Sequence, residues 1–290
     1  MGPRRHKLPM TIRRMQIEDI PAGLRLCRLS GWNQIKDDWL AFLDSPHGGG
    51  RLAERESVPI GTTTFLRYGG CFSWLSMMLV HPRARHAGVG RQLMDAALDA
   101  LAGETCICLD ATPLGVALYQ RFGFSGEYEL VRGTIMAPSG QVEFVPDNVR
   151  PMRACDLATV FARDRQVFGA DRSMLLASFY QRAPDLAWTV HRGEALLGYC
   201  FGRPGHLYRQ LGPVVAEDVS IAGNLVARCS NGQPEGRLAI DVPRLVPEWI
   251  AWLGSAGFVT ERPFLRMCRG QTHCPGLRSQ QFAIAGPEFG

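Results

Sequence analysis

Residues 74–102 read WLSMMLVHPRARHAGVGRQLMDAALDALA, and they organise the rest of the chain. The first seven, residues 74–80, are mostly apolar, and a short apolar run bounded by turn residues is typical of a strand buried on both faces. Pro82 ends this run, because proline has no N–H to donate to a sheet. From Val89 onward, apolar residues recur at steps of three and four, which predicts an amphipathic helix.

The junction between the expected strand and helix, residues 85–91, has the composition of an anion site. The first amides of a helix have no intrahelical partner, and the helix dipole places partial positive charge there. Gly88 and Gly90 let the backbone approach a ligand closely. Arg85 and Arg91 add full positive charges. A short Gly-x-Gly alone is equally typical of an ordinary tight turn, but the order of apolar strand, Arg-x-x-Gly-x-Gly and amphipathic helix favours phosphate binding.

This pattern resembles motif A of the GNAT N-acetyltransferases, in which Arg/Gln-x-x-Gly-x-Gly/Ala follows a central strand. Arg85, Gly88 and Gly90 fill its fixed positions. It differs from the dinucleotide fingerprint Gly-x-Gly-x-x-Gly and from a P-loop, which ends in Gly-Lys-Ser/Thr. The resemblance implies that the loop amides bind the diphosphate of acetyl-coenzyme A (acetyl-CoA), the acyl donor. The coenzyme contacts that it implies are Met78, Leu79, Val80, Arg85, His86, Ala87, Gly88, Val89, Gly90, Arg91 and Thr112.

The composition is that of an ordinary globular protein long enough for two domains. Of its 290 residues, 46% are hydrophobic and 20% are charged, which excludes a disordered chain. The net charge of +5 is modest and there is no long basic run apart from residues 4–7, so we expect no nucleic-acid partner. No apolar run reaches membrane-spanning length, so we expect no membrane association and a cytoplasmic location.

The chain has nine cysteines, none of them in a Cys-x-x-Cys pair. Most lie in apolar segments, which is typical of reduced, buried thiols in a cytoplasmic protein. Cys268, His273 and Cys274 have the chemistry of metal ligands, but no second matching pair accompanies them. We therefore expect no bound metal.

The second half of the chain weakly repeats the first. Four landmarks recur at offsets of 131 to 137 residues. Near-constant offsets across separate landmarks favour two copies of one fold over coincidence among common residues. The four pairs are Asp19 and Asp156, Gly61 and Gly198, Asp110 and Asp241, and Gly123 and Gly257.

The two copies differ at the expected coenzyme site. After its central strand, the second copy has Glu217 and Asp218 and lacks both the Gly-x-Gly and the arginine. Two acids there would repel a phosphate. Leu253 stands where the first copy has Tyr119. We therefore expect the second copy to be degenerate and unable to hold coenzyme A in the usual way.

Together with residues 168–172 and 285–288, this arrangement resembles the YitH-like tandem acetyltransferases. The resemblance implies an α/β (α+β) fold of two GNAT-like domains, each a twisted, mostly antiparallel mixed sheet flanked by helices. The expected catalytic domain spans residues 10–137, and the expected degenerate domain spans residues 146–288.

The leaving thiolate of a thioester must be protonated during acyl transfer to an amine. Residues 117–124, ALYQRFGF, resemble motif B of the GNAT enzymes, and the resemblance implies that Tyr119 is the general acid. A phenol with a pKa of about 10 is neutral at pH 7 and can donate a proton. The alternative is that Tyr119 only packs its ring on a helix.

The general base is not assigned by the sequence. A lysine-like amine with a pKa of about 10.4 is almost fully protonated at pH 7, so help in deprotonation is expected. Many GNAT enzymes place a Glu on or near the central strand, but the polar residue of 74–80 is Ser76. Asp37, Asp38 and Asp171 are candidates, and a water relay or a less basic amine would also suffice.

The acceptor site is expected at the loop after the first helix, because this loop overhangs the acceptor in the GNAT fold. Trp32 could stack on a substrate and Asn33 could orient it, and Asp37, which follows them closely, is the third expected substrate contact. It is equally consistent with the sequence that Trp32 fills the core at a helix end.

These features predict an N-acetyltransferase that moves an acetyl group from acetyl-CoA to a small-molecule amine by direct attack in a ternary complex. One alternative is a non-catalytic sensor that binds acyl-CoA, in which the missing base reflects lost catalysis. Another is a protein lysine acetyltransferase, which would need an open groove. The sequence also allows a homodimer.

Overall fold

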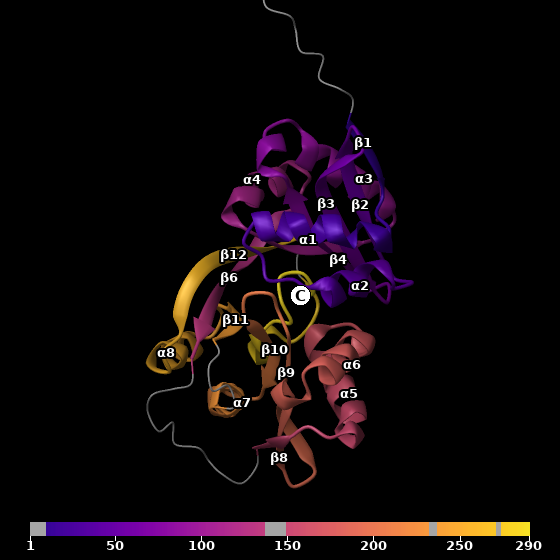
Figure 1. The fold of residues 1–290 in the computed structure, drawn as a ribbon. Helices are drawn as coiled ribbons and strands as arrows, with labels where there is room; N and C mark the ends of the chain where they lie inside the picture. The colour runs from indigo at the N-terminus through magenta and orange to yellow at the C-terminus, as the bar shows by residue number, and fades with distance from the viewer. Residues whose placement is uncertain (1–9, 137–148, 232–236, 271–273) are drawn as a thin grey trace, which may run out of the picture. The chain divides into compact units, whose positions relative to one another are not determined.

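The computed structural model describes residues 10–136, 149–231, 237–270 and 274–290 (Figure 1). The basic run at residues 4–7 and His273 lie outside these residues, as do parts of both expected domain boundaries, so the division into 10–137 and 146–288 stays a prediction. The chain forms two compact units, one of Met1–Leu66 with Leu75–Gly103 and one of Arg67–Trp74 with Glu104–Gly290.

The first unit is a small sheet with helices. Its strands are β1 (Met10–Arg14), β2 (Gly48–Arg55), β3 (Val58–Tyr68) and β4 (Phe72–Val80), and its helices are α1 (Ile20–Leu29), α2 (Lys36–Leu43) and α3 (Val89–Ala100). The strand order is β1–β2–β3–β4, with β1, β2 and β3 antiparallel. The end of β3 and the start of β4 belong to the second unit. The predicted strand at 74–80 is confirmed within β4, and the predicted helix is confirmed as α3.

The second unit is a larger, mostly antiparallel sheet with helices. Its order is β4–β5–β12–β6–β11–β10–β9–β8–β7, with β13 paired to β10, and the parallel pairs are β4 with β5 and β10 with β11. This confirms the predicted class of mixed, mostly antiparallel sheets flanked by helices. The strands are β5 (Cys106–Ala111), β6 (Ser125–Ile135), β7 (Val149–Pro151), β8 (Trp188–Arg192), β9 (Ala195–Arg203), β10 (Arg209–Ala216), β11 (Leu238–Pro243), β12 (Val259–Gly270) and β13 (Gln281–Ala283). The helices are α4 (Pro113–Arg121), α5 (Leu157–Phe168), α6 (Ser173–Arg182), α7 (Val219–Asn231) and α8 (Pro247–Ser255).

A strand glycine lets one helix approach the sheet closely in each unit. In the first unit, a Cβ at Gly61 would lie 3.0 Å from the side chains of Val89 and Leu93 on α3. In the second, a Cβ at Gly198 would lie 2.7 Å from the side chain of Ile221 on α7. Any larger residue would push these helices away from their strands. The repeat of Gly61 at Gly198 therefore has a packing reason.

Two long strands of the second unit, β6 and β12, exchange partners between the sequence repeats (Figure 1). Strand β12, from the second repeat, lies between β5 and β6, whereas β6, from the first repeat, lies between β12 and β11. Each of β5 and β11 is thus followed in its sheet by a strand from the other repeat. For this reason the second unit contains parts of both repeats.

The exchange places two equivalent arginine–aspartate pairs in the interior of the second unit. Arg266 of β12 lies opposite Asp110 of β5, and its Nε and Nη2 donate to the carboxylate at 2.6 and 2.9 Å. Arg132 of β6 lies opposite Asp241 of β11, with the same two bonds at 2.8 and 2.7 Å. These side chains are at most 4% exposed. The repeated aspartates are therefore the anchors of the exchanged strands.

The variant Arg132→Met is expected to lower the free energy of unfolding by about 3–5 kcal/mol, because it leaves the Asp241 carboxylate buried without its partner. The double variant Arg132→Met/Asp241→Leu should recover most of this loss, since no buried charge then remains. Urea unfolding of the full chain measures both changes.

An exposed pair provides the control. Arg209 and Asp185 have side chains 31% and 56% exposed, so Arg209→Met should cost less than about 1 kcal/mol. Equal losses in Arg132→Met and Arg209→Met, or a double variant no more stable than Arg132→Met, would contradict the anchoring role.

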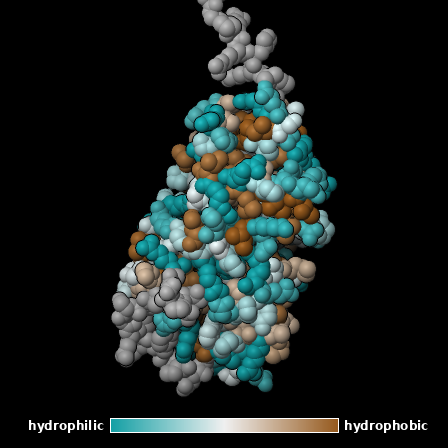
Figure 2. Space-filling model, in the orientation of Figure 1, coloured by the Kyte–Doolittle hydropathy of each residue, from teal (hydrophilic) through white to brown (hydrophobic). Residues whose placement is uncertain are grey.

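Hydrophilic residues are spread over the face seen in Figure 2 and separate several smaller groups of apolar residues. The large apolar side chains that are most exposed include Leu114 and Met174, each in the first turn of a helix. Across the described ranges, no helix combines the length and the apolar character that crossing a lipid bilayer requires.

Candidate functional site

The loop between β4 and α3 leads into the first turn of α3, whose backbone amides have no acceptor within the helix. Gly88 occupies the N-cap position of α3 with a φ of +82°, in the left-handed region that glycine adopts without strain. The first helical hydrogen bond runs from the Gln92 N–H to the Gly88 carbonyl at 3.1 Å. The amides of residues 89–91 therefore have no partner within the helix. An anion at this end would meet their N–H groups and the positive end of the helix dipole.

The side chains of this loop divide between solvent and core. Arg85 and Arg91 are exposed, and the Arg85 Nε donates to the carbonyl of Val80 at 3.3 Å, which holds the side chain near the end of β4. Val89 is buried in the core of the first unit, so its backbone amide is the part available to a coenzyme. The structure brings the expected contacts from Met78 to Arg91 together in one strand end and loop, and their contact with coenzyme A stays a prediction.

A strained residue in β4 directly precedes these contacts. Met77 has a φ of +49°, which a non-glycine residue rarely adopts. The Thr62 hydroxyl donates to the Met77 carbonyl at 3.0 Å. The Thr63 hydroxyl donates to the Ser76 carbonyl at 3.1 Å, and the Thr64 and Ser76 hydroxyls are 3.0 Å apart. Strain that is held in this way is common at functional sites. Neither Met77 nor the threonines that support it were among the residues predicted from the sequence.

The equivalent helix start in the second half is closed by its own side chain. Strand β10 ends at Ala216, and α7 begins at Val219 without an intervening glycine. The Asp218 carboxylate accepts the N–H of Ile221 at 2.9 Å, which satisfies a first-turn amide. It also puts negative charge where a phosphate would bind. That the second copy is degenerate stays a prediction.

The expected acceptor loop lies between α1 and α2. Trp32 is half-buried and Asn33 is buried. The Arg28 guanidinium donates to the carbonyls of Trp32 and Gln34 at 3.1 and 2.9 Å, which fixes the loop. The Oε1 atom of Gln34 is buried and meets no hydrogen-bond partner among the described residues, which is uncommon for an amide oxygen. Gln34 therefore joins Trp32 and Asn33 as a candidate acceptor contact.

Two of the candidate bases, Asp38 and Asp171, have structural roles, because their carboxylates accept backbone N–H groups at helix starts. The Asp38 carboxylate accepts the N–H of Ile35 at 2.9 Å and caps the start of α2. The Asp171 carboxylate accepts the N–H of Ser173 at 2.8 Å at the start of α6. Asp37 is exposed. These positions single out no general base.

Tyr119 lies on α4 in the second unit, in the helix that Thr112 precedes as its N-cap residue. It is 8% exposed, and its ring packs edge-on against Phe124, with the ring centroids 6.0 Å apart. A Cβ at Gly115 would lie 2.8 Å from the Tyr119 ring, so the absence of a side chain at position 115 leaves room for that ring. Burial raises the pKa of Tyr119 above its ordinary value of 10.0, so the phenol stays protonated at neutral pH. A protonated phenol is what a general acid requires.

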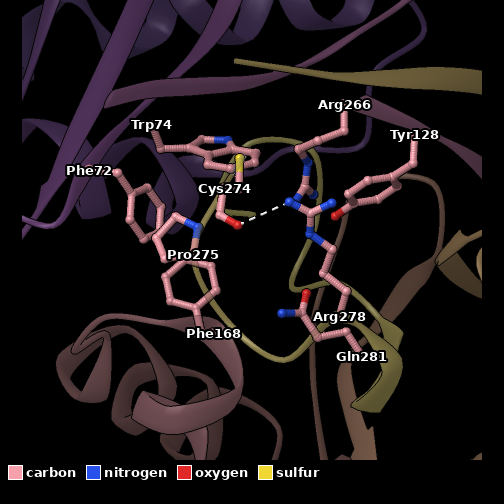
Figure 3. Close-up of a pocket in the computed structure, with 9 residues that line it drawn as sticks. All are labelled: Phe72, Trp74, Tyr128, Phe168, Arg266, Cys274, Pro275, Arg278 and Gln281. Atoms are coloured by element: carbon pink, nitrogen blue, oxygen red, sulfur yellow. Dashed lines mark hydrogen bonds between the residues drawn. The ribbon is translucent and has the colours of Figure 1, made fainter. Parts of the chain in front are cut away.

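The second unit also contains a pocket with aromatic walls (Figure 3). The guanidinium of Arg266 lies 4.5 Å from the ring centroid of Trp74 and 5.3 Å from that of Tyr128. Arg266 is balanced by its buried aspartate, and Arg278 forms an ion pair with Glu127. The pocket therefore offers flat rings and little net charge. Its other lining residues are Phe72, Phe168, Cys274, Pro275 and Gln281.

Two family models, both described as an acetyltransferase (GNAT) domain, match residues 47–126 and 160–283. The chain contains two GNAT domains in tandem. The predicted resemblance to tandem GNAT proteins is thereby confirmed, and by family this tandem GNAT protein is an acyltransferase. Its expected coenzyme loop lies in the first unit, and Thr112 and Tyr119 lie in the second.

Two relatives and one solved structure match between 78% and 100% of its length. A holothin acyltransferase from a Pseudoalteromonas species is 25% identical over 262 residues, which are 89% of this chain and 87% of the relative. The uncharacterized N-acetyltransferase YitH of Bacillus subtilis is 24% identical over 232 residues, 78% of this chain and 79% of the relative. A crystal structure of a putative acetyltransferase from Pyrococcus horikoshii aligns over 100% of both chains with a TM-score of 0.80 at 20% identity, which shows the shared fold.

Proposed function

We propose that this tandem GNAT protein transfers an acetyl group from acetyl-CoA to the amine of a small molecule by direct attack in a ternary complex. The observation that carries the proposal is the start of α3, where the amides of residues 89–91 are unpaired within the helix and Arg85 is exposed. The equivalent helix start in the second half is capped by Asp218. The proposal therefore gives each chain a single coenzyme site.

The proposed reaction divides its tasks among a few groups. Acetyl-CoA supplies a thioester whose carbonyl carbon is open to attack. The loop amides and Arg85 hold the diphosphate by charge-assisted hydrogen bonds. The acceptor nitrogen forms the new C–N bond and loses a proton to solvent or to a base, while the C–S bond breaks. Tyr119 gives its phenol proton to the departing sulfur and regains a proton from solvent.

The proposed acceptor is a small amine of low basicity. An amine of low basicity is unprotonated at pH 7, so it would not require the strong general base that the structure does not single out. The relative named as a holothin acyltransferase is consistent with a small-molecule acceptor.

A second candidate is a non-catalytic acyl-CoA sensor, which the unassigned base favours. Release of coenzyme A thiol on incubation with acetyl-CoA separates the two functions. We expect release with aromatic or heterocyclic amines to exceed that with alkylamines and lysine peptides by at least about tenfold in kcat/KM. Binding of acetyl-CoA without amine-dependent thiol release would favour the sensor, and preferential use of lysine peptides would favour a protein acetyltransferase.

A further inference from the structure

Four buried cysteines of the second unit have their sulfur atoms gathered at one place. Cys106 and Cys108 alternate on β5 and so point to the same face of the sheet. Cys268 of β12 lies directly opposite Cys108 in the antiparallel register. Cys274 follows β12 and returns to the same face. In the sequence, Cys268 and Cys274 have no second pair near them, and the strand exchange brings one to them from β5.

Each of these sulfur atoms lies in contact with at least one other. The Sγ–Sγ distances are 3.6 Å between Cys106 and Cys108, 3.4 Å between Cys108 and Cys268, and 2.8 Å between Cys268 and Cys274. Cys108 and Cys274 are joined as a disulfide across a sequence separation of 166 residues. One ligand atom from each of Cys108, Cys268 and Cys274 could reach a common ion.

We propose that the reduced form of this four-sulfur cluster binds one thiophilic divalent ion, with zinc as the first candidate. In a tetrahedral zinc site each Zn–S bond is about 2.3 Å, so the sulfur atoms stand about 3.8 Å apart. Two pairs, Cys106–Cys108 and Cys108–Cys268, already match this spacing to within a few tenths of an ångström. The Cys268–Cys274 pair, at 2.8 Å, would need to open by about 1 Å to reach it.

Formation of the site from the oxidised cluster requires a reductant. A dithiol reductant supplies two electrons and two protons, which break the Cys108–Cys274 bond and leave two thiols. Each cysteine that binds the ion then donates an electron pair from sulfur and releases its proton to solvent. The disulfide and the metal site are thus alternative states of the same residues.

The surroundings hold the Cys274 arm of the cluster in place. Glu127 accepts the N–H of Cys274 at 3.0 Å and lies 3.4 Å from the sulfur of Cys268. Arg278 forms an ion pair with Glu127. Its guanidinium also donates to the Cys274 carbonyl at 3.2 Å (Figure 3). In protein metal sites, residues that hydrogen-bond to the metal's ligands orient those ligands. Because Cys274 and Arg278 also line the aromatic pocket, an ion here would fix one wall of that pocket.

Metal analysis of the full-length chain purified under a dithiol reductant tests this inference independently of acyl transfer. We expect about one zinc ion per chain, released by a mercurial reagent that modifies thiols. Replacement by Co²⁺ should give the visible absorption of tetrahedral cobalt–thiolate coordination. In Cys268→Ser the zinc content and the cobalt absorption should each fall at least about tenfold.

Matched cysteine variants identify the site. Cys200 and Cys229 form another buried pair of thiols, 3.5 Å apart, so Cys200→Ser should retain the full metal content. The exposed Cys71 offers a second control, Cys71→Ser, with the same expectation. The inference is overturned if the reduced wild-type chain takes up neither Zn²⁺ nor Co²⁺, or if Cys268→Ser binds as much metal as Cys200→Ser.

Discussion

The double variant Arg85→Glu/Gly88→Leu is expected to bind acetyl-CoA about 100-fold more weakly than the wild-type chain, or not at all. A charge-assisted hydrogen bond contributes about 1.5–3 kcal/mol, and the introduced carboxylate repels the diphosphate as well. At a φ of +82°, a leucine side chain costs roughly 1–2 kcal/mol and occupies the approach to the amides. The dissociation constant for acetyl-CoA should rise and kcat/KM should fall by similar factors.

Two variants of the same unit control for strain and charge. Gly103 also has a positive φ, +92°, with open space around the position of a Cβ, but it follows the opposite end of α3. Arg25 is exposed on α1, and Arg25→Glu changes the net charge as Arg85→Glu does. Gly103→Leu and Arg25→Glu should each bind acetyl-CoA within about threefold of wild type. Losses as large as that of the double variant would show that the loop is not the coenzyme site.

Tyr119→Phe should lower kcat by about 10²–10⁴-fold, because the variant keeps the ring and loses the proton that the leaving sulfur takes. The KM for acetyl-CoA should change by less than about threefold, since the phenol acts on the departing thiolate and not on the diphosphate. Steady-state kinetics with a thiol-release assay measure both constants.

The pH dependence of kcat and a control variant at a second tyrosine test this role further. Burial raises the pKa of Tyr119 above 10.0, so in the wild-type chain its deprotonation should cause no loss of kcat below about pH 10. Tyr180 is a partly buried phenol on α6 whose hydroxyl donates to the Met152 carbonyl, and Tyr180→Phe should leave kcat unchanged. An unchanged kcat in Tyr119→Phe would remove the role of general acid.

Local features of the first half could be predicted from the sequence because their causes are local. The apolar run at 74–80, the glycines of the loop and the apolar period from Val89 each depend on residues within one turn or strand. The repeat could also be predicted from the sequence, since Gly61 and Gly198 each allow a helix to pack closely on a strand. Motif A therefore gave the position of the candidate coenzyme loop before its geometry was known.

The strand exchange could not be predicted, because both long strands have similar lengths and apolar content. Their pairing depends on Arg132 and Arg266, each of which meets an aspartate more than a hundred residues away. The sulfur cluster follows from the same exchange, which brings β5 to β12. A search for neighbouring Cys pairs in sequence could not join Cys108 to Cys268.

The strain at Met77 was hidden for a different reason. A positive φ in a strand leaves no mark on the residue itself, because methionine fits an ordinary strand equally well. The signal lay in the neighbouring strand, where Thr62, Thr63 and Thr64 are polar residues in a fully buried stretch. Buried hydroxyls need partners, and here those partners are the groups around the strained residue.

Calorimetric titration of the full chain with acetyl-CoA tests most directly whether one half alone holds the coenzyme, because it counts the sites. About one site per chain is expected, at the start of α3, because Asp218 closes the equivalent helix start. Two sites per chain, no uptake, or an unchanged site in Arg85→Glu/Gly88→Leu would contradict this assignment.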